Sequence, residues 1–546
     1  MRWKWILILT VGLFAVAGSG KKEERPATSR EVAPPLPSGR IAAVHFVGGV
    51  NASADTNAAF LKSIWLLPET QVLKEQTLNK LARVPYKLWN QRVRMGTNDF
   101  APLFRPLLDD LLRAESWLEV SGETNQTPDC VLAVRLDEAR AELWRTNLSA
   151  VLSTWTHLSA SEINSEGASG WELKKHHAPN LIRFVRVGDW VVLGAGQDKI
   201  LLADELIARI KAGGRPCPAE KDNWLSAEWD WAWLSKHLPV GVEIPKISRA
   251  RATLGGKDME LRTRVVMTRD GPFDWKPETW RIPTNIIRAP LVGFTAVQGI
   301  GDWLSRWKMN KAFKNDPMPD QFYVWTLKGV PLQTFLAASV NDASNALEQL
   351  APRLIGLNTN LPVRLVGGQI GWNTNRTVLK WAGLPFIIPF IEPVRETNGD
   401  FLFAGVFPNS FRRAPLPAGL LGQIVGRTNL VFYSWEITAE RILGVENISQ
   451  LFLLLARHQQ LDSKSAAGQW LATVGPGIGN TITEMTLTGP DELTLVRKSP
   501  IGLTAFELVV LANWVESPDF PLGGFQLMPR PARPVRPRPA AAPPPQ

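Results

Sequence analysis

Turns that contain Gly-Asp or Gly-Gly recur between apolar runs, and they constrain the fold more than any other feature of the sequence. Gly188-Asp189 and Gly399-Asp400 each precede an apolar run. A short turn of this kind between two apolar runs predicts a β-hairpin. Further hairpins are expected at 250–267 and at 483–496. Because hairpins join antiparallel strands, the pattern argues against a sheet built from strict β-α-β units.

The same signals occur twice in one order along the chain. The matched segments are 41–47 with 291–297, 130–136 with 321–327, 187–195 with 398–406, 223–231 with 429–437, and 250–267 with 483–496. The number of residues between matched segments differs from pair to pair, as insertions in loops would cause. We therefore expect an internal duplication. The alternative is two unrelated domains that share hairpin chemistry.

We expect an α+β fold with two related halves, in which antiparallel, hairpin-rich sheets are packed by helices. Apolar periodicity predicts helices near 58–67, 69–82, 102–117, 143–152, 300–307 and 332–350. The expected organisation is a signal peptide at 1–17, a flexible linker at 18–39, a first half at 40–270, a linker at 271–289, a second half at 290–525 and a disordered tail at 526–546.

Two short motifs lie at the hairpins and strands of the proposed repeat: Gly188-Asp189-Trp190 and Tyr433-Ser434-Trp435-Glu436. Through them the chain resembles uncharacterised exported bacterial proteins built from duplicated strand–helix and Gly-Asp hairpin modules. The resemblance covers most of residues 40–515. It implies the architecture alone, because that class brings no assigned activity and no catalytic residues.

The N-terminus has the pattern of a secretory signal peptide. Arg2 and Lys4 form a short basic start, and an apolar run extends from Ile6 to Ala17. The run is shorter than the roughly 20 residues that a membrane-spanning helix needs. Its small-residue end fits a cleavage site. We expect export to the periplasm or cell envelope of a bacterium with cleavage after Ala17; the alternative is an uncleaved N-terminal anchor.

The formal charge of +10 lies largely at the two ends of the chain. The first 25 residues hold five basic and two acidic side chains, and the last 18 hold four basic side chains and no acid, which leaves +3 for the middle. Such a balanced middle argues against a nucleic-acid partner. The tail is a candidate for attachment to an anionic envelope surface, and the alternative is a solvated tail. Its basic residues are Arg530, Arg533, Arg536 and Arg538.

No catalytic, cofactor-binding or metal-binding pattern stands out. The six histidines lack the spacing of a metal motif. Asp109-Asp110 is predicted to lie on the solvated face of a helix. Glu436 and Glu440 could share one face of a helix, and Asp230 could approach them, but general acid–base catalysis needs a paired geometry that sequence cannot show. We expect no enzyme activity, no cofactor and no structural metal.

The two cysteines, Cys130 and Cys217, are 87 residues apart in the sequence. An exported protein offers an environment in which they could form a disulfide. Nothing in the sequence shows that they meet, so two free buried thiols are favoured over a disulfide.

The aromatic composition is unusual, with 23 Trp and 22 Phe against 3 Tyr. The densest cluster contains Trp229, Trp231 and Trp233. On one continuous strand these three indoles would share a face and form a ribbon on which a ligand such as a sugar could stack. Burial in the core is favoured instead, because Trp is spread through both halves. The cluster remains the candidate ligand site.

These observations predict an exported, non-catalytic envelope protein with a structural or binding role. Two alternatives stay open. One is a carbohydrate- or lipid-binding protein that uses the aromatic strip or a cleft between the halves. The other is a secreted hydrolase without a recognisable motif.

Overall fold

The structure of the protein is a computed structural model. It describes residues 39–85, 99–122, 128–165, 167–174, 180–197, 200–218, 222–237, 247–306, 318–328, 333–356, 358, 367–384, 387–407, 414–415, 418–455, 463–518 and 520–521. The expected α+β class with an antiparallel sheet is confirmed. The predicted signal peptide and the tail with its four arginines lie outside the described residues, as does nearly all of the predicted N-terminal linker.

Twenty of the described strands form one open sheet, in which neighbouring strands pair antiparallel. From one edge to the centre the strands are β4 (Ser161–Ser165), β5 (Ala168–Lys174), β6 (Asn180–Val187), β7 (Trp190–Gln197), β3 (Asp129–Arg135), β2 (Ser116–Ser121), β1 (Arg40–Phe46), β8 (Leu225–Asp230), β9 (Ile247–Lys257) and β10 (Glu260–Arg269).

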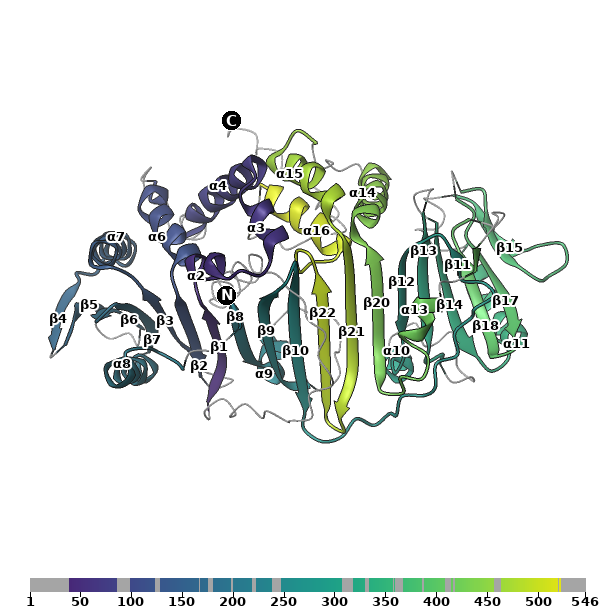
Figure 1. The fold of residues 1–546 in the computed structure, drawn as a ribbon, viewed down its shortest axis with the longest axis horizontal. Coiled ribbons are helices and arrows are strands. Elements are labelled where there is room, and N and C mark those ends of the chain that lie inside the picture. The colour runs from purple at the N-terminus through teal and green to yellow at the C-terminus, as the bar shows by residue number, and fades with distance from the viewer. Residues whose placement is uncertain are drawn as a thin grey trace, which may run out of the picture.

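From the other edge to the centre they are β15 (Gln369–Trp372), β16 (Leu379–Ala382), β17 (Phe390–Glu396), β18 (Gly399–Gly405), β14 (Thr334–Val340), β13 (Phe322–Leu327), β12 (Leu291–Val297), β20 (Leu430–Ile437), β21 (Asn480–Gly489) and β22 (Glu492–Ser499). The two series meet where β10 pairs with β22, from Leu261 opposite Ser499 to Thr268 opposite Glu492. Figure 1 shows this central joint between the teal and yellow strands.

Helices cover both faces of the first series of strands. Helix α7 (Glu138–Thr156) packs Trp144 and Leu148 on one face, and helix α8 (Leu201–Gly213) packs Leu206 on the other. In Figure 1 the two helices lie on opposite sides of the sheet. We call these two sides the α7 face and the α8 face. Both faces can be covered because neighbouring side chains of a strand point to opposite faces and apolar residues occur on each. In β3, Val131 packs with α8 and Val134 packs with α7.

The second series is covered in a similar way. Helix α11 (Ala343–Gly356) packs Leu347 and Ala351 against Leu402. The short helix α13 (Ala418–Gly422) and the segment around Trp280 cover the neighbouring aromatic core on the other face. A separate two-stranded sheet pairs β11 (Arg288–Ala289) with β19 (Ala414–Pro415).

Helices from both series share one core above the centre of the sheet. The helices after β1 are α2 (Gly49–Ala54), α3 (Ala59–Trp65), α4 (Pro68–Ala82) and α6 (Ala101–Arg113), and those of the C-terminal part are α14 (Thr438–Leu455), α15 (Ala466–Val474) and α16 (Ala505–Glu516). Ile64 packs with Leu471 and Leu508 in this core. Trp470 also donates a hydrogen bond to the hydroxyl of Thr70, with a nitrogen–oxygen distance of 3.0 Å. The two series are thus joined by helix packing as well as by the sheet.

Two expectations from the sequence were wrong in detail. The helix predicted at 102–117 ends at Arg113, and its last residues belong to β2. The stretch 332–350 is not one helix, because β14 precedes α11. In β14, Phe335 and Ala337 are buried on one face between β13 and β18. The strands lie in the order β1, β2, β3 in the first series and β12, β13, β14 in the second. Residues 130–136, most of which form β3, thus have the same position in the sheet as β14, and not the same position as 321–327.

Several other expected elements agree with the structure. The turn at Gly188 joins β6 to β7, and its φ of 57° lies in the left-handed region that suits glycine. The hairpins β9–β10 and β21–β22 form where they were expected. Both β8 and β20 run directly into helices, α9 (Trp231–His237) and α14 respectively.

Candidate functional site

The first candidate site is a carboxylate–arginine cluster on the α8 face. Glu115 lies just before β2, and Glu119 lies within it. Since side chains alternate along a strand, Glu115, Trp117 and Glu119 project to the same side of the sheet. Helix α8 supplies Arg209, and the turn after α8 supplies Arg215.

Glu119 is fully buried and surrounded by charged donors. Its Oε1 accepts hydrogen bonds from Arg209 Nη2 and Trp117 Nε1, each with a donor–acceptor distance of 2.7 Å. Its Oε2 accepts from Arg40 Nη1. A second carboxylate, that of Glu205, accepts from Arg40 at 2.8 Å. The buried negative charge is therefore matched by two guanidinium groups, as buried ions require.

Glu115 is held by a different set of donors. Its Oε1 lies 2.6 Å from Arg215 Nη2 and 3.0 Å from His45 Nε2. Arg135 lies farther away, with a nitrogen–oxygen distance of 3.8 Å. Burial alone would raise the pKa of Glu115, but the hydrogen bonds and charges of His45 and Arg215 outweigh it and hold the pKa below its ordinary value.

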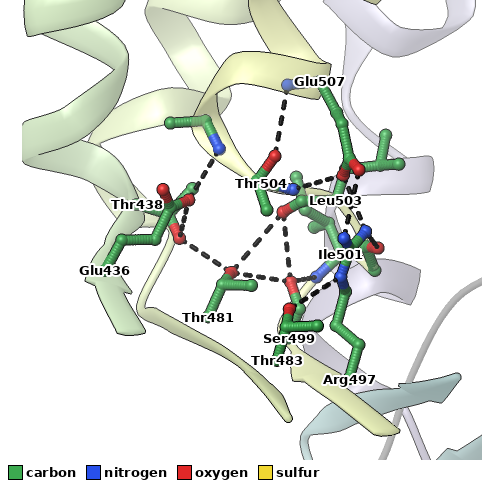
Figure 2. Close-up of polar contacts among 12 residues, drawn as sticks. Glu436, Thr438, Thr481, Thr483, Arg497, Ser499, Ile501, Leu503, Thr504 and Glu507 are labelled. Carbon is green, nitrogen blue, oxygen red and sulfur yellow. Dashed lines mark hydrogen bonds and ion pairs between the residues drawn. The ribbon is translucent and has the colours of Figure 1, made fainter. Parts of the chain in front are cut away.

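The second candidate site is a hydroxyl cluster where β20, β21 and β22 meet the start of α16 (Figure 2). It contains Glu436, Thr438, Thr481 and Ser499, all of them buried. The hydroxyl oxygens of Thr438 and Thr481 are 2.8 Å apart, and Thr481 donates to Ser499 at 3.0 Å. Ser499 in turn donates to the carbonyl of Leu503 at 3.3 Å. The chain of hydroxyls thus ends on the backbone.

Glu436 accepts hydrogen bonds mainly from neutral groups. The N–H of Ala505 donates to its Oε1 at 2.7 Å, and the Thr438 hydroxyl donates at 3.3 Å. Glu436 also faces a cation, Arg441, whose Nε lies 4.0 Å from Oε2 and which also donates to the Thr326 hydroxyl. Burial raises the pKa of Glu436 and outweighs these favourable contacts. Burial also lowers the pKa of Arg441.

A capping box beside Glu436 begins helix α16. Thr504 accepts from the N–H of Glu507, and the Glu507 carboxylate accepts from the N–H of Thr504 at 2.8 Å. Arg497 on β22 donates to both Glu507 oxygens, at 2.7 and 3.1 Å (Figure 2). Thr504 and Glu507 cap the first turn of α16. Glu436 on β20 and Arg497 on β22 bind this turn, so the contacts hold the start of the helix on the sheet.

The carboxylates of both clusters contact donors that belong to the protein itself. A nucleophile needs a base that can take its proton, and a general acid or base needs access to a substrate. In both clusters the carboxylate oxygens accept from the protein's own donors. Sequence reasoning missed Glu115 and Glu119, although the alternation Glu115-Ser116-Trp117-Leu118-Glu119 was a signal for a strand with polar groups on one face.

The tryptophans proposed as a ligand site do not form a ribbon. β8 ends at Asp230, so Trp229 lies on a strand, whereas Trp231 and Trp233 lie on helix α9. Trp233 is buried against Ile41 and Val120. The ring centroids of Trp229 and Trp231 are 6.5 Å apart and tilted by 48°.

Several other residues lie where the sequence did not place them. Asp110 is buried, not solvated, because Arg140 and Trp144 donate to its carboxylate at 2.7 and 2.9 Å. Glu440 forms an ion pair with Lys328, with a nitrogen–oxygen distance of 2.6 Å. Asp230 is on β8, which β9, β10, β22 and β21 separate from Glu436 on β20, so the three acids do not meet.

Both cysteines are free thiols. Burial and the neighbouring charge of Asp129 raise the pKa of Cys130 to about 12. The Cys130 thiol therefore stays protonated at neutral pH and is a poor nucleophile.

Within the described residues, no group of three or more His, Cys, Asp or Glu side chains is arranged to hold a metal ion. Among the helices of the described ranges, none is long and apolar enough to cross a membrane. Comparison with protein-family models, with curated proteins and with solved structures found no match.

Proposed function

We propose that this chain is an exported, non-catalytic protein of a bacterial cell envelope that acts by binding. The observation that supports a non-catalytic role is the state of the buried carboxylates. Glu115, Glu119 and Glu436 are engaged by the protein's own N–H and O–H donors. A group that fixes one element on another stabilises the fold, whereas a catalytic acid or base must reach a substrate proton.

Export is proposed from the signal-like pattern of residues 1–17. The experiment expresses the full chain and a variant that lacks residues 2–17 in a bacterium, followed by fractionation and mass determination of the N-terminus. We expect the full chain in the periplasmic or envelope fraction with Gly18 as its first residue, and the shortened variant in the cytoplasm. A full chain that stays in the cytoplasm with Met1 retained would contradict export.

We further propose that the two series of strands are related halves produced by duplication. The supporting observation is that both series have the same connectivity. β1, β2, β3, β7, β8, β9 and β10 occupy the same positions in the first series as β12, β13, β14, β18, β20, β21 and β22 in the second. The central pairing of β10 with β22 is antiparallel, as an approximate two-fold axis perpendicular to the sheet requires.

An experimental structure tests the duplication directly. Segments 40–269 and 291–499 should superpose strand for strand in this correspondence. A best superposition that aligns β3 with β13 instead would contradict it, because the topological match would then be accidental.

A further inference from the structure

The two edge strands of the sheet, β4 and β15, differ in how their outward backbone groups are bonded. They lie at opposite ends of the molecule in Figure 1. At β15, the Nδ2 of Asn358 donates to the carbonyl of Ile370, and the N–H of Ile370 donates to the Oδ1 of Asn358, each at 2.9 Å. A neighbouring antiparallel strand would make the same two bonds. The side chain of Asn358 therefore closes this edge at Ile370.

At β4 the outward backbone groups have no such cap. Val187 and Trp190 flank a two-residue turn, so they form a hydrogen-bonded pair. Bonded and non-bonded pairs alternate along an antiparallel ladder, and each residue bonds to one side only. Carried across β6 and β5, this pattern makes Ile163 bond to β5 and leaves the N–H and C=O of Glu162 and Asn164 pointing outward. Among the described residues, none forms a hydrogen bond with these outward groups.

The residues of β4 do not protect this edge in the usual ways. Free edges are commonly protected by prolines, lysines, bulges or a covering segment. β4 contains neither proline nor lysine, and it pairs with β5 without a shift of register. Ser161, Glu162 and Asn164 are exposed to solvent, and Ile163 is half-buried. The charge of Glu162 is paired with Arg145 of α7 at 2.6 Å. β4 can therefore accept another strand.

The sequence of β4 is nearly symmetrical about Ile163, which favours a second copy of this chain as the partner. In an antiparallel pair centred on Ile163, Glu162 of one copy lies opposite Asn164 of the other, so the outward backbone groups of the two copies meet. The two Ile163 side chains also meet, on the α8 face. Centred on Glu162 or on Asn164, the pair would set one glutamate against another, which is destabilising. The charge pattern therefore selects the register centred on Ile163.

The helices near this edge leave room for a second copy. α7 packs on Trp171 of β5. In the symmetrical pair the two β5 strands are three strand spacings apart, which is about 14 Å. Packed helices need only about 8–10 Å between their axes, so the two α7 helices do not overlap. α8 packs over β3 and β7 on the other face, farther from the edge.

We propose that two copies of this chain associate through β4, so that the antiparallel sheet continues from one copy into the other. The inference goes beyond the proposed function, because the association depends neither on export nor on a ligand. Glu162 and Asn164 of the two copies would exchange about four backbone hydrogen bonds. So short a contact predicts a weak dimer whose population rises with protein concentration.

Disulfide trapping in the full chain tests the register. Ile163→Cys should give a covalent dimer on oxidation with copper phenanthroline, because opposite residues of a non-hydrogen-bonded pair have Cα atoms about 4.5 Å apart, within disulfide range. Ser161→Cys is the matched control on the same face of the same strand. Its two thiols would be about 14 Å apart along the strands, so its yield should be at least about tenfold lower. The wild type, with Cys130 and Cys217, sets the background.

Sedimentation velocity at about 1–500 μM protein measures the reversible association. Asn164→Lys places a cation opposite Glu162 of the second copy and should tighten the dimer by at least about threefold. Asn164→Glu places like charges opposite each other and should weaken it by at least about threefold. Since Asn164 is exposed, both variants should keep the urea midpoint of the wild type.

Four results would overturn the proposal. Equal trapping of Ile163→Cys and Ser161→Cys would exclude the register, as would effects of the same sign in the two Asn164 variants. A species larger than a dimer would mean that β4 pairs with a different surface of the next copy. A chain that stays monomeric and is not trapped would leave β4 to a strand from another protein. None of these results bears on the fractionation test of export.

Discussion

Glu119 and Glu436 are both enclosed by protein, yet the charges of their neighbours differ. Two guanidinium groups contact Glu119, whereas Glu436 accepts from a backbone N–H and a hydroxyl, with Arg441 4.0 Å away. Glu115, in the same cluster as Glu119, has a lowered pKa, and Glu436 has a raised one. Burial raises both pKa values, and at Glu115 the hydrogen bonds and charges of His45 and Arg215 outweigh it, whereas at Glu436 the contacts of Ala505, Arg441 and Thr438 do not.

The largest effect is expected where a buried charge loses its partner. Glu119→Gln leaves Arg40 and Arg209 facing a neutral amide, so the free energy of unfolding should fall by about 3–5 kcal/mol. Urea unfolding followed by tryptophan fluorescence measures it. Glu205→Gln is the matched control, because Glu205 is the exposed partner of Arg40 and should contribute at most about 1 kcal/mol. Equal losses in the two variants would contradict the distinction.

A smaller effect is expected in the hydroxyl cluster, where the contacts are mostly neutral. Thr504→Ala removes the side chain that caps α16 and should lower the free energy of unfolding by about 1 kcal/mol. Thr504→Ser keeps a hydroxyl that can cap the helix and should restore most of the loss. If serine fails to restore stability, the methyl group of Thr504 rather than its hydroxyl is what matters.

The smallest effect concerns pH. The pKa of Glu115 is lowered in the folded state, so its contribution is present above the ordinary value of 4.5 and is lost as the pH falls through the lowered pKa. The pKa of Glu436 is raised, so its contribution is present below 4.5 and is lost as the pH rises through the raised pKa.

Unfolding free energies of Glu115→Gln and Glu436→Gln, measured from about pH 3 to 7, test these signs. With rising pH, the stability of the wild type relative to Glu115→Gln should increase, and relative to Glu436→Gln it should decrease. Slopes of the same sign would mean that burial alone sets both pKa values.

Much of the fold follows from local sequence signals, but the polar clusters do not. The turn at Gly188 and the hairpin at 250–267 could be predicted because a turn and its two strands are adjacent in the sequence. The strand β14 was missed, since its apolar residues run on toward those of α11 and also fit a helical spacing.

The candidate sites depend on contacts between distant segments. Glu119 meets Arg209 from a helix 90 positions later, and Glu436 meets the N–H of Ala505 69 positions later. Asp110 was placed in solvent because its partner Arg140 belongs to another helix. Charge alone does not reveal which residues the fold will bring together.

The central joint has a consequence for the order in which the chain is made. Leu261 pairs with Ser499, so the outer edge of β10 has no partner until β22 has been synthesised. During that interval the nascent first series presents an unpaired strand edge, which is a template for pairing with another chain. The basic residues of β10 bring mutual repulsion to such an encounter, so Arg262 and Arg264 also oppose association between two incomplete chains.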